Sequence, residues 1–208
     1  DVTIRNREFG IVAGVEKKLV HDQLTATLTA RMDKNENFQA LFSPALSLVY
    51  AKTPAHVWRL GFSSAIRNPT LADQYLYYNV GRALLLGNVS GQFEAGQDSM
   101  FTIESFNDYR DNGLQRSLLD YFHVDRVRPE QVKTVEIGYR GTHWKNIYFD
   151  FGAYNSWYKD FIGYVVGLHT QFDQTTGFPI GGLQVFRVAA NATSQVVTRG
   201  VNAGLTWY

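Results

Sequence analysis

The sequence contains no cysteine, and its 208 residues include only 5 prolines, 2 methionines and 19% charged residues. The absence of cysteine excludes disulfide scaffolds, thiolate zinc sites and cysteine nucleophiles. Acidic and basic residues nearly cancel to a net charge of +1, so no overall field favours nucleic acid as a partner. The longest apolar stretches, such as residues 83–86, are far shorter than the ~20 residues of a membrane-spanning helix.

Aromatic residues and glycine are abundant instead. The chain has 14 Phe, 12 Tyr, 4 Trp and 18 Gly, and 45% of its residues are hydrophobic. This apolar fraction is too high for a disordered chain. High tyrosine and glycine contents with few charges favour β-structure.

The hydrophobic pattern has a period of two along most of the chain. In residues 24–32 the even positions are Leu, Ala, Leu, Ala and Met, whereas the odd positions are Thr, Thr, Thr and Arg. Successive strand side chains point to opposite faces, so this segment predicts a strand with one apolar and one polar face. The pattern predicts about eight strands, the others lying at residues 9–17, 45–50, 58–63, 134–140, 147–152, 183–190 and 201–207.

The polar face of these strands is small and weakly charged. Soluble sandwiches usually expose Lys and Glu there, whereas this chain has mainly Thr, Gly, Ser and Asn. In an outer-membrane barrel the apolar face contacts lipid and the polar face lines the lumen. We therefore expect one set of side chains in residues 24–30 to face lipid and the alternate set to face the lumen. The expected lipid-facing set is Leu24, Ala26, Leu28 and Ala30, and the lumenal set is Thr25, Thr27 and Thr29.

Short and long connections alternate between the predicted strands, as do the periplasmic turns and outer loops of bacterial barrels. The predicted short links are residues 19–23, 51–56, 141–146 and 193–195, and the longer ones are 33–37, 67–128 and 160–182. The sequence therefore predicts an all-β fold: an antiparallel transmembrane β-barrel segment surrounded by the lipid bilayer, in the outer membrane of a Gram-negative bacterium.

Several short motifs follow one another in a characteristic order through residues 24–160. A strand ends in Arg67-Asn68-Pro69-Thr70-Leu71, and Asp73-Gln74-Tyr75 follows it. Gly87-Asn88, Pro129-Glu130 and Glu136-Ile137-Gly138 come next. This order of motifs resembles that in TonB-dependent outer-membrane receptors. The general character of the sequence is similar to that of receptors from the Bacteroidota. One departure is the insertion of residues 89–127, so the resemblance does not carry a ligand identity with it.

The resemblance implies a barrel of about 22 strands around a plug domain. We therefore expect residues 1–208 to be a C-terminal part of such a barrel domain, with the plug and the TonB-contacting segment lying upstream. It also implies the partners: the protein's own plug, the TonB complex through the N-terminal region, and a surface lipoprotein or other outer-membrane protein as a further candidate.

The long outer loop, residues 67–128, is rich in side chains that seek burial or contact. Loops of this length are usually functional or disordered, and this composition argues against disorder. The helical spacing of Leu114, Leu118, Leu119 and Phe122 predicts a short helix in the loop. The candidate ligand-binding residues are Tyr75, Tyr77, Tyr78, Arg82, Phe106 and Tyr109. Packing of the loop against its neighbours is the alternative interpretation.

A second group of candidates has structural or plug-facing roles. Pro69 ends a strand because it lacks the N–H of a ladder bond, and Arg67 is expected to hold the base of the loop or touch the plug. Charges predicted on the polar face would pair with the plug or line water-filled space. This group comprises Arg67, Pro69, Glu136, Arg140 and Asp150.

No constellation in the sequence predicts enzymatic chemistry. The five histidines form no close pair along the chain, so surface positions are favoured over a metal site. Serine-hydrolase, phosphate-loop and His-Glu-x-x-His motifs are all absent. We expect neither a cofactor nor catalysis. Two functions remain: TonB-coupled, energy-dependent uptake of a scarce nutrient, or a non-transporting barrel that serves a structural or secretion complex. A passive porin is a third alternative.

Overall fold

The computed structural model describes residues 3–91, 100–144, 146–173 and 175–208. The chain forms two compact units. The strand unit comprises residues 1–67, 130–161 and 194–208, and the loop unit comprises residues 68–129 and 162–193. No helix in the described residues is long and apolar enough to cross a membrane.

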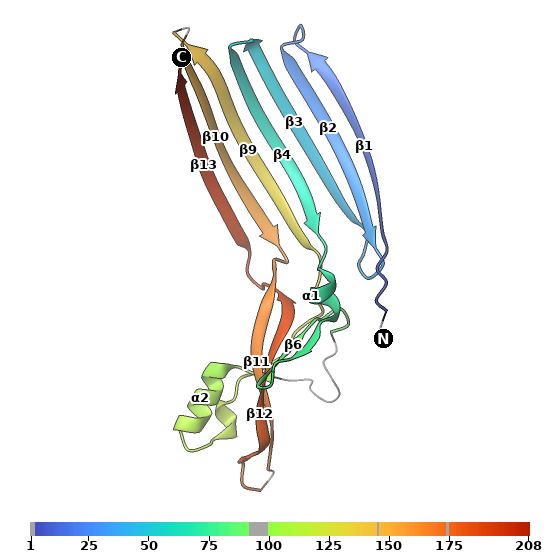
Figure 1. Ribbon diagram of the computed structural model, residues 1–208, viewed down its shortest axis with the longest axis vertical. Helices are drawn as coiled ribbons and strands as arrows, with labels where there is room; N and C mark the ends of the chain where they lie inside the picture. Colours follow the sequence, from blue (N-terminus) through green and yellow to red (C-terminus); the bar gives the residue numbers. More distant parts are fainter. Residues whose placement is uncertain (1–2, 92–99, 145, 174) are drawn as a thin grey trace. The chain divides into compact units, whose positions relative to one another are not determined.

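A single antiparallel sheet of seven strands makes up the strand unit, in the order β1-β2-β3-β4-β9-β10-β13 (Figure 1). The strands are 12 to 14 residues long, long enough to cross a bilayer at a tilt. Their bounds are Glu8–Leu19, Leu24–Asn35, Leu41–Thr53, His56–Arg67, Glu130–His143, Ile147–Lys159 and Val196–Trp207. β1 and β13 are the edges, so this sheet is open.

The register confirms the predicted alternation of faces. Thr27 pairs with Ser47, and Leu28 pairs with Leu46, so in this part of the sheet neighbouring strands present residues of like polarity to the same face. The apolar face remains uncovered, with Val201 73% exposed and Leu205 70% exposed. Such an extended apolar surface requires a partner or lipid.

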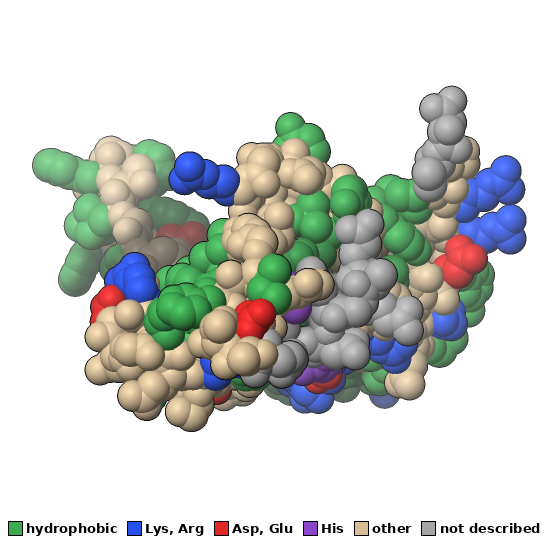
Figure 2. All heavy atoms as spheres, turned by 90° about the horizontal axis from the view of Figure 1, so that it is seen from below, with side chains coloured by type: hydrophobic (Ala, Val, Ile, Leu, Met, Phe, Trp, Pro, Cys, Tyr) green, Lys and Arg blue, Asp and Glu red, His purple; other side chains and the backbone are tan. Residues whose placement is uncertain are grey.

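The loop unit contains a second sheet of six strands, in the order β5-β6-β12-β11-β7-β8. These strands span Tyr77–Asn79, Ala83–Leu86, Pro179–Asn191, Ile162–Phe172, Met100–Phe101 and Tyr121–Phe122. The unit also holds helices α1 (Leu71–Tyr75) and α2 (Ile103–Asp111) and a 3-10 turn, η1 (Arg116–Leu118). Figure 2, which shows the chain from below, has hydrophobic side chains beside atoms of other side chains and the backbone, with charged side chains scattered among them.

Two apolar clusters form the core of the loop unit. One centres on Phe186 and Val188 of β12, with Met100 and Leu84 packed against them. The other joins Phe101, Tyr109, Leu119 and Leu168. The strand unit has no comparable cluster among its described residues, which is consistent with a sheet whose two faces meet other surroundings.

The structure corrects three details of the sequence interpretation. Residues 183–190 do form a strand, but β12 belongs to the loop unit and the long sheet has seven strands. The short link 193–195 therefore joins the loop unit to β13 and is not a turn between neighbouring barrel strands. The predicted helix at residues 114–122 is wrong, because Leu114 has a φ of 60° and the chain there forms η1 and β8. The longer of the two helices described in this loop, α2, lies earlier, at Ile103–Asp111.

Candidate functional site

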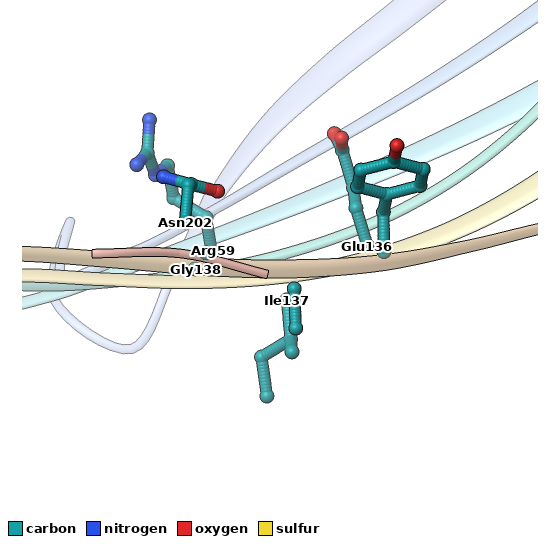
Figure 3. A pocket seen from close by; sticks show the side chains of 8 residues that line it. Arg59, Glu136, Ile137, Gly138 and Asn202 are labelled. Atoms are coloured by element: carbon teal, nitrogen blue, oxygen red, sulfur yellow. The ribbon is translucent and has the colours of Figure 1, made fainter. Parts of the chain in front are cut away.

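The polar face of the long sheet carries a hollow of about 180 Å³ across β4, β9, β10 and β13. Arg59, Gly138, Gly152 and Asn202 line it from one register row, and Glu136 and Tyr154 line it from the next row, where Gly61 and Gly200 flank them. The first row has its two glycines in the middle, and the second has them at its ends. Figure 3 shows Arg59, Asn202 and Glu136 on one side of the sheet, while Ile137 points to the other.

Glycines make the floor of this hollow because neighbouring side chains lie flat across them. A Cβ atom at Gly61 would stand 2.7 Å from Oε1 of Glu136, and one at Gly152 would stand 2.5 Å from Oδ1 of Asn202. The Arg59 guanidinium covers Gly138 in the same way. Any larger residue at these positions would lift the polar side chain off the sheet and change the shape of the hollow.

The charges around the hollow are exposed and loosely paired. Arg59 Nη2 lies 3.4 Å from Oδ1 of Asp150, and both side chains are more than a third exposed. Arg140 pairs in register with Asp150, beside the hollow. Glu136 lines the rim of the hollow and is exposed. The face therefore offers a carboxylate, guanidinium groups and amides to whatever lies against it.

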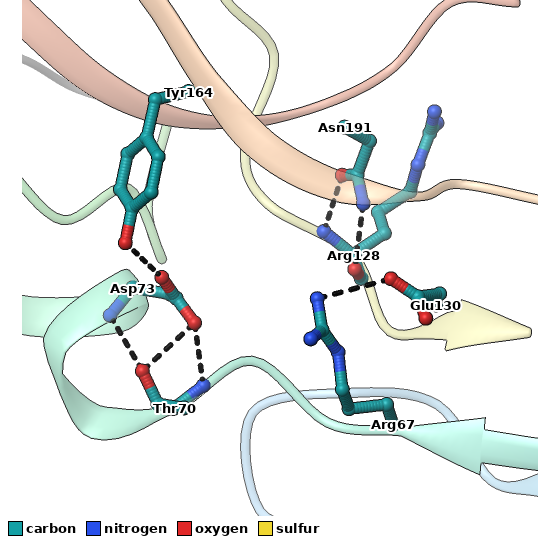
Figure 4. Close-up of polar contacts among 7 residues, drawn as sticks. All are labelled: Arg67, Thr70, Asp73, Arg128, Glu130, Tyr164 and Asn191. Carbon is teal, nitrogen blue, oxygen red and sulfur yellow. Dashed lines mark hydrogen bonds and ion pairs between the residues drawn. The ribbon is translucent and has the colours of Figure 1, made fainter.

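Where the long sheet ends, Arg67 and Glu130 close the last register pair of β4 and β9. Arg67 Nη2 lies 3.0 Å from Oε2 of Glu130, whose side chain is only 8% exposed (Figure 4). The Arg67 guanidinium also lies over the ring of Phe161, at 6.0 Å. The ion pair joins the end of β4, where the chain leaves the sheet, to the start of β9, where it returns.

The motif that follows Arg67 forms the first hydrogen-bonded turn of the loop unit. Thr70 and Asp73 make a reciprocal capping box at the start of α1, the arrangement that satisfies two otherwise unpaired N–H groups. The hydroxyl of Tyr164 donates to the other Asp73 oxygen at 3.0 Å (Figure 4). Pro69 is buried, and its carbonyl accepts a bond from the side chain of Gln74 at 2.7 Å.

The Gly87-Asn88 element closes the same turn from the other side. The amides of Gly87 and Asn88 donate to the carbonyls of Leu76 and Asp73, and a Cβ at Gly87 would strike the α1 backbone. Asn88 is 1% exposed, and its amide donates to the carbonyls of Asp125 and Ala189. Arg128 and Asn191 exchange two further bonds of 2.7 and 2.8 Å between the return segment and β12.

The six candidate ligand-binding residues do not form one cluster. Tyr77 and Tyr78 on β5 are 56% and 59% exposed, and Arg82 follows them in an exposed turn. Tyr75 is half-buried at the end of α1. Tyr109 is 1% exposed and donates to the carbonyl of Gly177, and Phe106 packs beside it. These last two side chains are core residues, so their positions favour the packing interpretation for that part of the loop.

The turn whose Gly177 carbonyl accepts a hydrogen bond from Tyr109 also contains a carboxylate that is bonded to backbone amides. Asp173 accepts bonds from the amides of Thr176 and Thr175, at 2.7 and 2.8 Å. These amides lower the pKa of Asp173 below its usual range, with Thr176 the larger cause, because they stabilise the ionised form. The charge of this side chain adds to the two backbone bonds that close the same turn, from Gly177 to the Asp173 carbonyl and from Asp173 to the Phe178 carbonyl.

Two histidines that are distant along the chain lie close together in the structure. His56 and His143 have ring centroids 5.0 Å apart, and the hydroxyl of Tyr139 lies between them, 2.8 Å from Nδ1 of His56 and 2.9 Å from Nε2 of His143. Antiparallel pairing of β4 with β9 brings them together, which spacing along the chain did not show. Among the described residues, no group of three or more acidic or histidine side chains is arranged to hold a metal.

Comparison with known families identifies this architecture. Residues 2–208 match the family described as TonB dependent receptor-like, beta-barrel. The chain belongs to the TonB-dependent receptor β-barrel family. This confirms the resemblance that the order of the loop motifs predicted. No curated protein matches the chain.

Solved structures show the same fold at low sequence identity. The siderophore receptor PirA of Acinetobacter baumannii has a TM-score of 0.61 and 14% identity, over 96% of this chain and 25% of its own. A mutant ferric enterobactin receptor PfeA of Pseudomonas aeruginosa, in complex with enterobactin, has a TM-score of 0.62 and 17% identity, over 95% and 24%.

The FrpB iron transporter of Neisseria meningitidis has a TM-score of 0.55 and 12% identity, over 98% of this chain and 24% of its own. The chain thus spans about a quarter of the length of these proteins. The family and these neighbours are receptors and transporters, not enzymes.

Sequence reasoning placed Arg59 and Asn202 on the polar face but did not show that they meet at one hollow. No sequence motif includes Arg59, Asn202 or Tyr154. These residues come together only because the register of four strands aligns them. The available signal was a glycine at a polar-face position in the middle of a strand, as at Gly61 in one strand and Gly138 in another. Glycines in strand interiors mark a close approach of other groups.

Proposed function

We propose that this chain forms part of an outer-membrane receptor that takes up a scarce nutrient in a TonB-coupled, energy-dependent manner. The observation that carries the proposal is the two-faced sheet of a TonB-dependent receptor barrel. Its apolar face, with Val201 and Leu205 uncovered, suits lipid. Its polar face, with glycines beneath Glu136 and Asn202, suits a lumen that holds another folded element.

The occupant we propose for the polar face is the receptor's own plug domain. The hollow offers Glu136, Arg59 and Asn202 on a floor without side chains, so a protruding plug side chain can approach the sheet closely. Arg140 and Asp150 lie in the adjoining register row and would contact the plug or water around it. A passive porin would need no such interlocking surface.

The loop unit is proposed to face the outside and to meet the ligand or a surface lipoprotein. Its two apolar cores fix β5 and the following turn, leaving Tyr77, Tyr78 and Arg82 exposed. Exposed tyrosines and arginine beside a rigid scaffold are typical of binding surfaces. Ferric enterobactin, named for one structural neighbour, is a suitable first ligand for testing.

The test uses the full-length receptor that contains this chain, in cells with and without a functional TonB. We expect ligand accumulation only in cells with TonB. Uptake that persists without TonB indicates a porin, and surface binding without accumulation indicates a non-transporting barrel. Both results would refute the proposal.

A variant of the hollow tests the plug contact separately. We expect Glu136→Gln to lower uptake several-fold while the barrel still assembles, because a rim carboxylate facing the plug is lost. Glu16→Gln is the matched control, since Glu16 lies on the same face of the edge strand β1. Equal uptake by both variants would remove Glu136 from the plug interface.

A further inference from the structure

The two faces of the long sheet differ in the sign of their charges: the polar face carries both acidic and basic residues, whereas the apolar face carries basic residues alone among its regularly paired positions. In the regularly paired strands, register places every acidic residue on the polar face. These residues are Glu8, Glu16, Asp33, Glu130, Glu136 and Asp150. The charged residues on the apolar face are all basic, namely Lys17, Lys34, Lys133, Lys159 and Arg199. Lys52, at the irregular pairing of β3 with β4, is left out of this comparison.

Three of these cations surround one tryptophan, and we name this group the Trp157 cluster: Trp157, Lys133, Lys159 and Arg199. Lys133 is the register partner of Trp157, and Lys159 lies two residues further along the same strand. Arg199 pairs with Asn155, two residues before Trp157. Same-face neighbours at these positions lie within about 5–8 Å of each other, so three positive side chains flank a single exposed indole.

The positive charge of this cluster is not compensated within the described part of the chain. None of its three cations takes part in an ion pair there, and all three are exposed. Arg199 uses Nε to donate to Oδ1 of Asn155 at 2.6 Å, which fixes the guanidinium and leaves its terminal nitrogens available. Nδ2 of Asn155 is buried beneath this group and has no partner among the described residues.

The position of the cluster along the strands matches one membrane interface. Lys133 and His143 are ten residues apart on β9, which is about 34 Å along the strand and about 26 Å along the normal at a typical tilt. The residues between them on this face include Val135 and Ile137. Near His143 lie the rings of Tyr139 and Trp144, a typical aromatic belt at the opposite interface.

We infer that the Trp157 cluster binds the phosphate groups of a lipid in the membrane leaflet at the end of the sheet where Lys159 leads into the loop unit. Charge complementarity identifies the occupant, because clustered basic residues at a membrane interface attract anionic headgroups. Lys and Arg stems lie along apolar surface while their charged ends reach the headgroup level. The neighbouring Val135 and Val197 would contact the acyl chains. The inference rests on the proposed function only in requiring that the apolar face meets lipid.

The test measures lipid binding to the purified full-length receptor by native mass spectrometry. The probe is lipid A with two phosphate groups, and the comparison lipid is the same molecule without phosphates. We expect the K133Q/K159Q/R199Q variant to bind the phosphorylated lipid about 100-fold more weakly, at roughly fivefold for each basic residue lost. K17Q is the matched control, since Lys17 lies on the same face near the opposite end of the sheet, and its affinity should be unchanged.

Several outcomes would overturn the inference. Undiminished binding by the triple variant, an equal loss for the phosphate-free lipid, or an equal loss in K17Q would show contact with acyl chains or bulk charge instead. If the triple variant does not assemble, K133Q and R199Q are measured singly, each with an expected fivefold loss, and an absent loss refutes the site. Uptake is scored separately, so a receptor that binds lipid but does not transport contradicts only the proposed function.

Discussion

Arg67 and Glu130 form an ion pair of 3.0 Å at the last register position of β4 and β9, with the carboxylate buried and the guanidinium half exposed. The chain leaves the sheet after Arg67 and returns at Glu130, so this contact clamps the two ends of a 62-residue excursion, residues 68–129. Bringing the ends of so long a segment together costs conformational entropy. The ion pair offsets part of this cost by fixing the two ends of the segment.

We expect Arg67→Ala to destabilise this base by about 1 kcal/mol, a figure already reduced for the exposure of the guanidinium. Limited proteolysis should then cut residues 68–129 faster, while barrel assembly is retained. Arg59→Ala is the control, because the pair of Arg59 with Asp150 is longer, at 3.4 Å, and both partners are exposed. Equal protease sensitivity in the two variants would contradict a clamping role for Arg67.

A second prediction concerns the contact of Gly87 with helix α1. A Cβ there would meet backbone atoms of Gln74, Tyr75 and Leu76, which cannot rotate away as a side chain can. We expect Gly87→Ala to destabilise the loop unit by about 1–3 kcal/mol, as overpacking usually does. Gly163→Ala is the control, since a Cβ at Gly163 meets nothing within 4 Å. Both variants are heated in steps, and trypsin cleavage within the loop unit reports the temperature at which that unit unfolds. An unchanged unfolding midpoint for Gly87→Ala would refute the prediction.

The two faces of β2 give a third prediction. Leu28 is 52% exposed on the apolar face, and Thr27 lines a depression on the polar face. Leu28→Arg should destabilise the assembled barrel by about 2–4 kcal/mol if it lies near the bilayer midplane, because lipid cannot solvate the guanidinium. Thr27→Arg should cost much less. Folding titrations into lipid vesicles compare the two, and equal tolerance would reverse the assignment of the faces.

The long sheet was predictable because each strand carries its own evidence. In β2 and β9 the alternation of polar and apolar residues is complete within one segment, and lipid on one side requires it to be so. In the loop unit this signal was present in part of β12, at residues 183–190, and absent in β11. Val165 of β11 and Phe186 of β12 pack with Met100 and Phe122 in the core of that unit, so the environment of β11 depends on segments that are distant along the chain.

The hollow and the helix show where local sequence stops being informative. Glu136 was recognised through its motif, but its neighbours Arg59 and Asn202 come from strands on either side and are set by register alone. The Leu114–Phe122 spacing was compatible with a helix, yet Gly113 and Leu114 both adopt positive φ. That turn ends α2, and tertiary packing of Leu119 into the core overrides the local pattern.

A fourth prediction uses the charge of Asp173. Its pKa is lowered by the amides of Thr176 and Thr175, so the turn is stabilised fully above the unfolded value of about 3.9 and loses this stabilisation as pH falls through the lower folded value. Hydrogen exchange at Thr175 and Thr176, corrected for intrinsic rates, should accelerate only in that acidic range. Asp173→Ala should exchange fast at every pH, and a pH-independent wild type would refute the assignment.

The last prediction separates binding from packing in the loop unit. Tyr77 and Tyr78 lie on β5 at the edge of the second sheet and expose more than half of their surface, whereas Tyr109 is enclosed and bonded to Gly177. We expect Tyr77→Ala/Tyr78→Ala to weaken ligand or partner binding about tenfold, because exposed tyrosines contribute strongly at interfaces, and to leave unfolding unchanged. Ile103→Ala, a truncation of a 48% exposed residue on α2, controls for loss of surface area.

Tyr109→Ala should show the opposite pattern, with the loop unit destabilised by about 3–5 kcal/mol. Isothermal titration with each candidate ligand and thermal unfolding are run on the same samples. If the double variant binds as the wild type does, β5 is only a structural edge and ligand contact must be sought elsewhere on the loop unit.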